Sequence, residues 1–174
     1  MQHFASQIIG KSILSFHSGK SVGEVTKFYI NQSTLKIDLL QVSNDKGKTY
    51  LLTKDIKSIS YIFISINSED ELALDDELIR YKQIIKGNFS IIGLKVFSED
   101  NAYLGRIKDY TIDYVEFKLS KIHLKAPLLK RILNQSLIID RSQIVKVKKD
   151  MVIVKSARVK SKIKNSKVLQ AKAN

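Results

Sequence analysis

The chain has 174 residues, of which 44% are hydrophobic and 27% are charged, and it contains no cysteine. This composition is that of a globular protein, and it excludes disulfides, thiol catalysis and cysteine-based zinc sites. The formal net charge of +13 favours a polyanionic partner such as RNA, DNA or an anionic membrane surface. A composition drawn from an AT-rich genome is the alternative source of this charge.

Neither a membrane span nor a secretory signal is visible in the sequence. No apolar run approaches the roughly 18 residues that a membrane-spanning helix needs. Residues 1–10 lack the basic start, long apolar centre and small-residue cleavage site of a secretory signal. We therefore expect a cytoplasmic protein.

Residues 8–25 are repeated at residues 91–107. The match pairs Ile8-Ile9-Gly10 with Ile91-Ile92-Gly93, and Val22-Gly23 with Leu104-Gly105. A period of about 83 residues is that of a small domain rather than of a solenoid unit, so we predict two tandem copies of one domain. Because each copy is small, we expect the copies to pack against each other or against a partner. The predicted divisions are copy one at residues 8–66, an acidic helical linker at 67–88, copy two at 89–155 and a basic tail at 156–174.

In copy one, residues 22–30 have the β-branched and aromatic content of a strand, but their apolar positions do not keep a period of two. A β-bulge at or just after Gly23 would restore the alternation, and the same offsets recur around Gly105. Residues 17–20 and 99–102 are predicted hairpin turns, because Gly, Asp and Asn tolerate the backbone conformations that turns require.

Strands with one buried face are predicted to follow each hairpin. Their apolar positions are Leu35, Ile37 and Leu39 in copy one, and Val115, Phe117 and Leu119 in copy two. Further short strands are predicted at residues 50–53, 58–66, 136–140, 144–148 and 151–154. The sequence therefore predicts a mainly β fold, made of two tandem small β-barrels joined by a short helical linker and followed by a basic tail.

Between the copies, the sequence predicts a helix within residues 69–86. Ser68 and Glu71 have the spacing of a capping box, four apolar residues from Leu74 to Ile85 fall on one helical face, and Gly87 suits the C-terminal cap. The acidic residues lie in the N-terminal half and the cations in the C-terminal half, which complements the helix dipole. The acids therefore have a structural explanation, and their spacing does not match a calcium loop.

Copy two carries an insertion at residues 125–136 that contains the single proline, Pro127. Pro127 suits the first turn of a short helix. The insertion either caps the open end of its barrel or forms an exposed contact loop. In the second case the partner-contact residues are Leu128, Leu129, Lys130 and Arg131.

The C-terminal tail is the most basic part of the chain. From Lys155 to the end there are seven cations and no acid. Such a segment either binds the phosphates of a polyanion without sequence specificity or serves only as a solubilising terminus. The candidate polyanion-binding residues are Lys155, Arg158, Lys160, Lys162, Lys164 and Lys167.

No catalytic constellation is recognisable in the sequence. The three histidines, His3, His17 and His123, are far apart and none has a second histidine at metal-ligand spacing. Gly10-Lys11-Ser12 and Gly19-Lys20-Ser21 resemble the end of a phosphate-binding loop, but the glycine required five residues earlier is Ala5 or Leu14. We therefore expect no enzyme activity, no catalytic residues, no cofactor, no metal and no small-molecule substrate.

Several short motifs carry a family resemblance. They are Ile9-Gly10-Lys11, Val22-Gly23-Glu24-Val25 and Thr53-Lys54-Asp55-Ile56 in copy one, and Ile92-Gly93, Leu104-Gly105-Arg106-Ile107-Lys108-Asp109, Asp140-Arg141-Ser142-Gln143-Ile144 and Met151-Val152-Ile153-Val154 in copy two. The pattern resembles the PRC-barrel family, which includes the C-terminal domain of RimM-type ribosome-maturation factors and the cytoplasmic domain of the photosynthetic reaction-centre H subunit. The resemblance implies a barrel of five or six strands per copy and a non-catalytic role. It carries over no functional residue, because the matching positions are folding positions.

The function expected from these observations is that of an adaptor whose barrels bind a protein partner. One alternative is an RNA- or ribosome-associated maturation factor that uses the basic tail, and another is peripheral attachment to an anionic membrane. The parts in which the two copies differ, which are the insertion, the linker and the tail, are the expected places of function.

Overall fold

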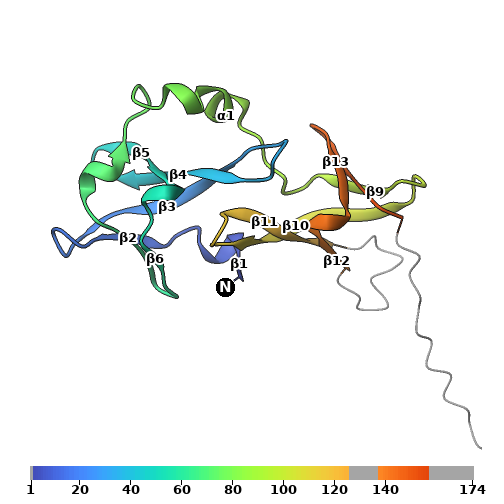
Figure 1. Cartoon of the computed structure of the whole chain (residues 1–174), viewed down its shortest axis with the longest axis horizontal. Helices are drawn as coiled ribbons and strands as arrows, with labels where there is room; N and C mark the ends of the chain where they lie inside the picture. The colour runs from blue at the N-terminus through green and yellow to red at the C-terminus, as the bar shows by residue number, and fades with distance from the viewer. Residues whose placement is uncertain (1, 126–136, 157–174) are drawn as a thin grey trace, which may run out of the picture.

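A computed structural model describes residues 2–125 and 137–156 of the chain, and these residues form two seven-stranded sheets and one short helix (Figure 1). The first sheet consists of β2 (Ser12–Ser15), β3 (Ser21–Ile30), β4 (Ile37–Asn44), β5 (Gly47–Leu52), β6 (Ser58–Ile59), β7 (Phe63–Ile66) and β8 (Leu72–Ala73). The second consists of β1 (Gln2–Phe4), β9 (Lys95–Ser98), β10 (Tyr103–Asp113), β11 (Lys118–Lys125), β12 (Leu137–Asp140), β13 (Ile144–Val147) and β14 (Met151–Val154). The mainly β fold predicted from the sequence is confirmed.

The two sheets have the same strand order. The first runs β6-β7-β2-β3-β4-β5-β8 and the second runs β13-β14-β9-β10-β11-β12, with β1 paired to β10. The pairs β2–β7 and β9–β14 are parallel, and the other pairs are antiparallel. Both paths are open, so the expected closed barrels are not present as hydrogen-bonded rings in the described residues. In the first sheet, β8 pairs with the edge of β5 that would have to meet β6 for closure.

The glycines of the repeated stretch have matching roles in both sheets. The N–H of Gly10 donates to the carbonyl of Val25 at 2.8 Å, and the N–H of Gly93 donates to that of Ile107 at 2.8 Å. The long strands β3 and β10 are bulged on both sides of their glycine, before Gly23 and Gly105 and again after Val25 and Ile107. The bulge expected at or just after Gly23 is thus two bulges that flank the glycine. The predicted turns at residues 17–20 and 99–102 connect β2 to β3 and β9 to β10.

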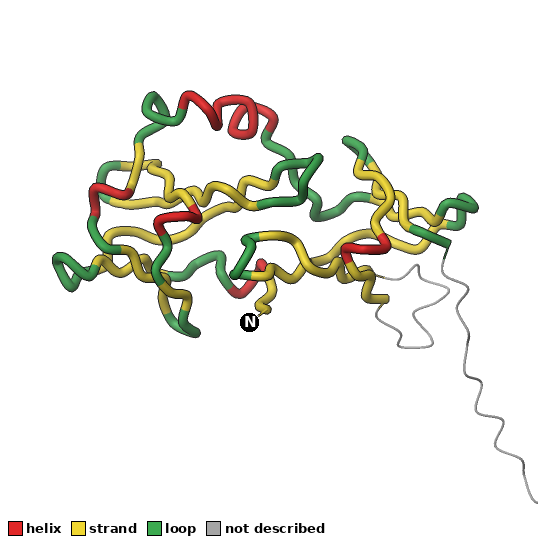
Figure 2. Tube along the Cα trace, viewed as in Figure 1, coloured by secondary structure: helices red, strands yellow, loops and turns green. Residues whose placement is uncertain are grey.

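The linker is far less helical than the sequence indicates. Within residues 67–88 the structure has the 3₁₀ turns η3 (Glu69–Glu71) and η4 (Ile79–Tyr81), the strand β8, and the helix α1 (Lys82–Gly87) (Figure 2). Leu72 and Ala73 pair with β5 and add a short strand to the first sheet, so the acidic half of the segment is not a continuous helix. Ser68 still accepts a hydrogen bond from the N–H of Asp70, but it caps only the single turn of η3.

Two of the strand predictions are also wrong in detail. Residues 58–66 do not form one strand, because the Ser60 hydroxyl accepts hydrogen bonds from the N–H groups of Ile62 and Phe63 and turns the chain between β6 and β7. The strands predicted to include positions 35 and 115–117 begin later, since Leu35 lies before β4 and both Val115 and Phe117 lie in the turn before β11, where Val115 is 86% exposed.

One hydrophobic core cluster contains residues of both sheets, among them Val25 and Ile64 of the first and Ile107 and Val152 of the second. A segment of the linker packs over the first sheet outside this core. Leu78, before η4, packs with Tyr29, Leu39 and Tyr50 in a smaller cluster over the first sheet. The 3₁₀ turns η1 (Ala5–Gln7) and η2 (Thr53–Asp55) complete the description, together with η5 (Arg141–Gln143), which connects β12 to β13.

Candidate functional site

The two sheets meet through the turns that connect β3 to β4 and β10 to β11. The N–H of Ile37 donates to the carbonyl of Phe117 at 2.7 Å, and the N–H of Leu119 donates to the carbonyl of Leu35 at 3.0 Å. Strand registers make Leu35 equivalent to Phe117 and Ile37 equivalent to Leu119, since Ile37 faces Ile30 and Leu119 faces Ile112. The contact is therefore reciprocal, as in an interface with two-fold symmetry.

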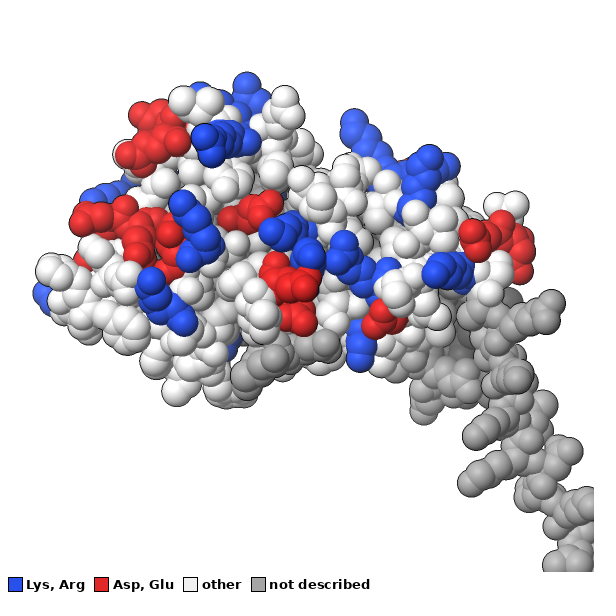
Figure 3. Space-filling model, viewed as in Figure 1, with Lys and Arg blue, Asp and Glu red and all other residues white. Residues whose placement is uncertain are grey.

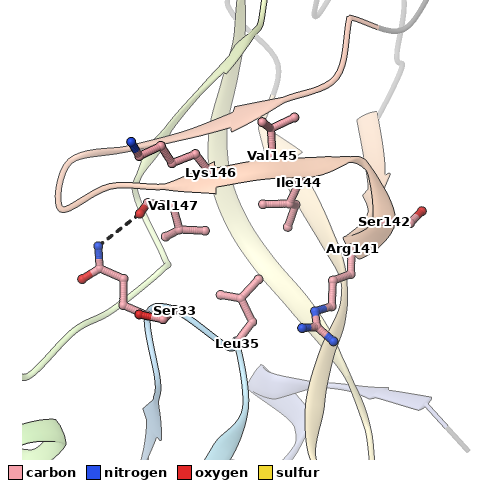
Figure 4. Close-up of a pocket in the computed structure, with 9 residues that line it drawn as sticks. Ser33, Leu35, Arg141, Ser142, Ile144, Val145, Lys146 and Val147 are labelled. Atoms are coloured by element: carbon pink, nitrogen blue, oxygen red, sulfur yellow. Dashed lines mark hydrogen bonds between the residues drawn. The ribbon is translucent and has the colours of Figure 1, made fainter.

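A groove of about 670 Å³ opens beside this junction, which we call the junction groove (Figure 4). Leu35 of the first half and Ile144 and Val147 of the second point toward one another and form its apolar floor. Its other lining residues are Gln32, Ser33, Arg141, Ser142, Val145 and Lys146. The groove thus combines residues of the β3–β4 turn with those of η5 and β13.

The polar rim of the junction groove is cationic. Arg141 and Lys146 line it, and no Asp or Glu is among the lining residues. The nearby carboxylate of Asp140 accepts hydrogen bonds from the N–H and hydroxyl of Ser142, and these bonds lower the pKa of Asp140. Lys and Arg side chains also gather over the part of the surface where β13 lies (Figure 3). The rim therefore favours a ligand that carries carboxylates or another anionic group.

Two hydrogen bonds between the halves fix the walls of the groove. The Arg141 guanidinium donates to the carbonyl of Thr34 at 2.7 Å, and the Gln32 amide donates to the carbonyl of Val147 at 3.3 Å. Asn31 shapes the turn, because its side chain accepts from the N–H groups of Ser33 and Thr34. The walls are thus held in place before any ligand binds, which lowers the entropic cost of binding.

On the groove side of the junction two residues are less bulky than their counterparts in the other half. Gln32 and Leu35 occupy the positions that Tyr114 and Phe117 occupy in the other half, where the two aromatic rings lie 6.1 Å apart. In the reciprocal contact, the β10–β11 turn therefore contributes two aromatic side chains. The β3–β4 turn contributes an amide and an aliphatic side chain. This difference in volume leaves space between Leu35 and β13.

Among the described residues, β13 is an edge strand, since it ends the path of the second sheet and its one partner there is β14. Its residues Ile144–Val147 line the groove along its length. An unpaired strand edge next to a groove can take an extended peptide as an additional strand, with backbone hydrogen bonds providing affinity and side-chain pockets providing specificity. The junction groove and the edge of β13 thus lie side by side.

Few of the site residues expected from the sequence fall within the described residues. Leu128, Leu129, Lys130 and Arg131 of the insertion lie outside them, as do Arg158, Lys160, Lys162, Lys164 and Lys167 of the tail. Lys155 is exposed after β14, and its N–H donates to the carbonyl of Gln143 at 2.8 Å. It does not line the junction groove.

Arg141 and Lys146 were missed by the sequence analysis as site residues. Arg141 was assigned to a folding motif, and Lys146 to an ordinary strand with one exposed face. Their place at the groove depends on contacts between residues more than 100 positions apart, since Arg141 donates to the carbonyl of Thr34 and Gln32 donates to the carbonyl of Val147.

The described residues were also compared with the requirements of a metal site and of a membrane-spanning helix. They contain no group of three or more His, Cys, Asp and Glu side chains arranged to hold a metal ion. His123 is buried beside Phe4, with their ring centroids 4.7 Å apart, whereas His17 is exposed in the β2–β3 turn. No helix in residues 2–125 or 137–156 is long and apolar enough to cross a membrane.

Comparison with known proteins gives one assignment. The model of the PRC-barrel domain matches residues 87–160, which span α1's last residue and the whole of β9 to β14. A search of curated proteins returned no match to the chain. The match covers the half of the protein that contributes Arg141, β13 and the cationic rim of the groove.

Proposed function

Because residues 87–160 belong to the PRC-barrel domain family, we propose that the protein is a non-enzymatic adaptor that binds an acidic, extended segment of a partner protein. The observation that carries this proposal is the position of an edge strand, β13, along a groove whose rim has two cations and no carboxylate. The match of residues 87–160 to the PRC-barrel domain supports a binding role by analogy of fold alone.

We further propose that residues 8–66 form a second domain of the same family. The support is the strand order of β2 to β7, which repeats that of β9 to β14. The matching hydrogen bonds of Gly10 and Gly93 support it as well. In this proposal the adaptor consists of two copies that contact each other at the β3–β4 and β10–β11 turns. The partner protein binds in the junction groove beside this contact.

The groove determines the chemistry of the partner. Lys146 is exposed on β13 and favours a carboxylate, while Leu35 and Val147 favour an apolar side chain next to it. Because successive side chains of an extended segment point to opposite faces, a segment that presents an acidic and an apolar side chain to the groove would carry them two residues apart. The partner is therefore expected to contribute a strand-forming segment rather than a helix.

A photo-crosslinking experiment tests the proposal. A benzoylphenylalanine at Ser33, which is exposed on the groove wall, should crosslink in cells to a specific protein. Lys146→Glu should abolish the crosslink, because the acid repels an acidic segment. Lys148→Glu is the matched control, since Lys148 is exposed on the same hairpin but does not line the groove.

The same experiment separates the adaptor from an RNA-associated factor. Nuclease treatment and deletion of residues 156–174 should leave the crosslinked protein unchanged. Recovery of nucleic acid alone, or an equal crosslink in the Lys146→Glu and wild-type proteins, would show that the groove does not bind a protein segment.

A further inference from the structure

The hairpin formed by β6 and β7 exposes two large apolar side chains at its tip. Tyr61 is 85% exposed and Ile62 is 75% exposed. The hairpin projects from the body of the first half, at the lower left of Figure 1. We call residues 60–63 the apolar tip. It does not line the junction groove and lies in the other half of the molecule from β13.

Hydrogen bonds hold the apolar tip in one conformation. The Ser60 hydroxyl accepts from the N–H groups of Ile62 at 3.2 Å and Phe63 at 2.9 Å. The ammonium of Lys11 donates to the carbonyl of Ser60 at 2.8 Å and to that of Tyr61, and it lies 5.4 Å from the centroid of the Tyr61 ring. Because Lys11 is only 7% exposed, these bonds anchor the tip from beneath.

The fold itself does not require an apolar tip. In the second half the equivalent turn contains Lys148, Lys149 and Asp150, and the N–H of Lys148 donates to the carbonyl of Met151 as the N–H of Ser60 does to that of Phe63. The position equivalent to Lys11 is Leu94, whose N–H donates to Ile91 as that of Lys11 does to Ile8. Both the exposed pair and the lysine beneath it are therefore specific to the first half.

The hairpin that carries the apolar tip contains no acidic residue. The sequence has no acid between Asp55 and Glu69, and the exposed Lys54 and Lys57 precede the hairpin. The tip thus has an exposed tyrosine next to an exposed isoleucine, and two exposed lysines precede its hairpin. These side chains are of the kinds that bind at the surface of an anionic bilayer. Tyrosine favours the headgroup level, isoleucine favours the acyl chains, and lysines are attracted to anionic lipids.

We propose that the apolar tip inserts into the surface of an anionic lipid bilayer, with Ile62 among the acyl chains and Tyr61 at the headgroups. Two inserted side chains give only weak binding by themselves, so a second signal is needed for stable attachment. The net charge of +13, including seven cations after Val154, supplies an electrostatic one. Binding is therefore expected to weaken as the salt concentration rises.

The absence of tryptophan from the chain allows a direct test. In the full-length Tyr61→Trp protein the emission of the single tryptophan should shift to the blue when vesicles of phosphatidylcholine and phosphatidylglycerol are added. Lipids with brominated acyl chains should quench it. Val115→Trp is the matched control, because Val115 is 86% exposed and lies in a turn of the other half, so its emission should not change.

A second variant measures the contribution of the inserted side chain. Adding Ile62→Ser to the Tyr61→Trp protein should lower the partition coefficient about tenfold, the value for losing insertion of one large aliphatic side chain. Unchanged tryptophan emission from a Tyr61→Trp protein that still sediments with the vesicles would overturn the proposal, because the cations alone would then account for attachment. Equal blue shifts for the tip and control variants would overturn it as well.

Discussion

Gly23 shows how a single residue is constrained by the neighbouring strand. A Cβ atom at this position would lie 2.5 Å from Cγ1 of Val42 and 2.8 Å from the carbonyl oxygen of Ser43, and the backbone φ is +152°. We expect Gly23→Ala to lower the free energy of unfolding by about 3 kcal/mol, through overpacking and backbone strain together. Urea denaturation measures this loss.

Gly19→Ala is the control for the steric part of that loss. Gly19 has a φ of +67° but no atom within 4 Å of its added Cβ, so only the conformational cost of about 1 kcal/mol should appear. Equal losses in the two variants would contradict the contact with β4.

His123 is the residue at which stability should depend on pH. It is buried, its Nε2 has no hydrogen-bond partner among the described residues, and the ring lies against Phe4. Burial lowers the pKa of His123; Lys108 and Lys121 lower it further, and Asp109 opposes them. The folded protein therefore binds the imidazole proton less readily than the unfolded chain does.

The direction of the pH effect follows from this difference. Stability should be fully present above the unfolded pKa of about 6.5 and should fall as the pH drops below it, because protonation then favours unfolding. Urea titrations between about pH 7.5 and pH 5 measure the slope, in a range above most carboxyl titrations. His123→Gln should remove the slope, and a slope that persists would assign it to other groups.

At the scale of elements, the sequence predicted well those turns and strands whose conformation depends on residues close in the chain. The hairpin turns at residues 17–20 and 99–102, and the strands that follow them, were predictable because turn residues and β-branched residues act locally. The irregularity around Gly23 was visible as a break in alternation. Its division into two bulges was not, because each bulge is defined against a different neighbouring strand.

The linker was mispredicted because a distant strand competes with its local preference. Residues 69–86 have the capping and periodicity of a helix, but Leu72 and Ala73 instead pair with Leu51 and Tyr50. Tyr50 also donates a hydrogen bond to the carboxylate of Asp75 at 2.9 Å. These contacts outweigh helix propensities of only a few tenths of a kcal/mol per residue, so the helix is confined to α1.

The candidate site could not be predicted for a related reason. Nothing near Lys146 in the sequence indicates that Gln32 and Leu35 lie opposite it, since this arrangement comes from the reciprocal contact between the two halves. The groove and the apolar tip also lie where the two halves differ, although not at the insertion, linker or tail to which the sequence pointed. Gln32 and Leu35 in place of Tyr114 and Phe117 open the groove, and Tyr61-Ile62 in place of Lys149-Asp150 form the apolar tip.

At the scale of the whole molecule, the two halves depend on each other for their cores. The N-terminal strand β1 pairs with β10 of the second half, although the rest of the adjoining chain belongs to the first. Leu35 of the first half belongs to the core cluster that also contains Leu119 and Val152 of the second. The halves are thus not independently packed domains, and each would lose part of its buried surface without the other.

This shared core should make the protein unfold in a single transition. Phe63→Trp and Phe97→Trp, each as the only tryptophan, place a partly buried probe in the first and second half, and their urea curves should coincide. Adding Leu35→Ala should lower the free energy of unfolding by about 2–4 kcal/mol and shift both curves equally, because the cavity lies in the common core. A shift of the Phe63→Trp curve alone would mean that the halves unfold independently and that the groove between them is a contact of separate domains rather than part of one folded unit.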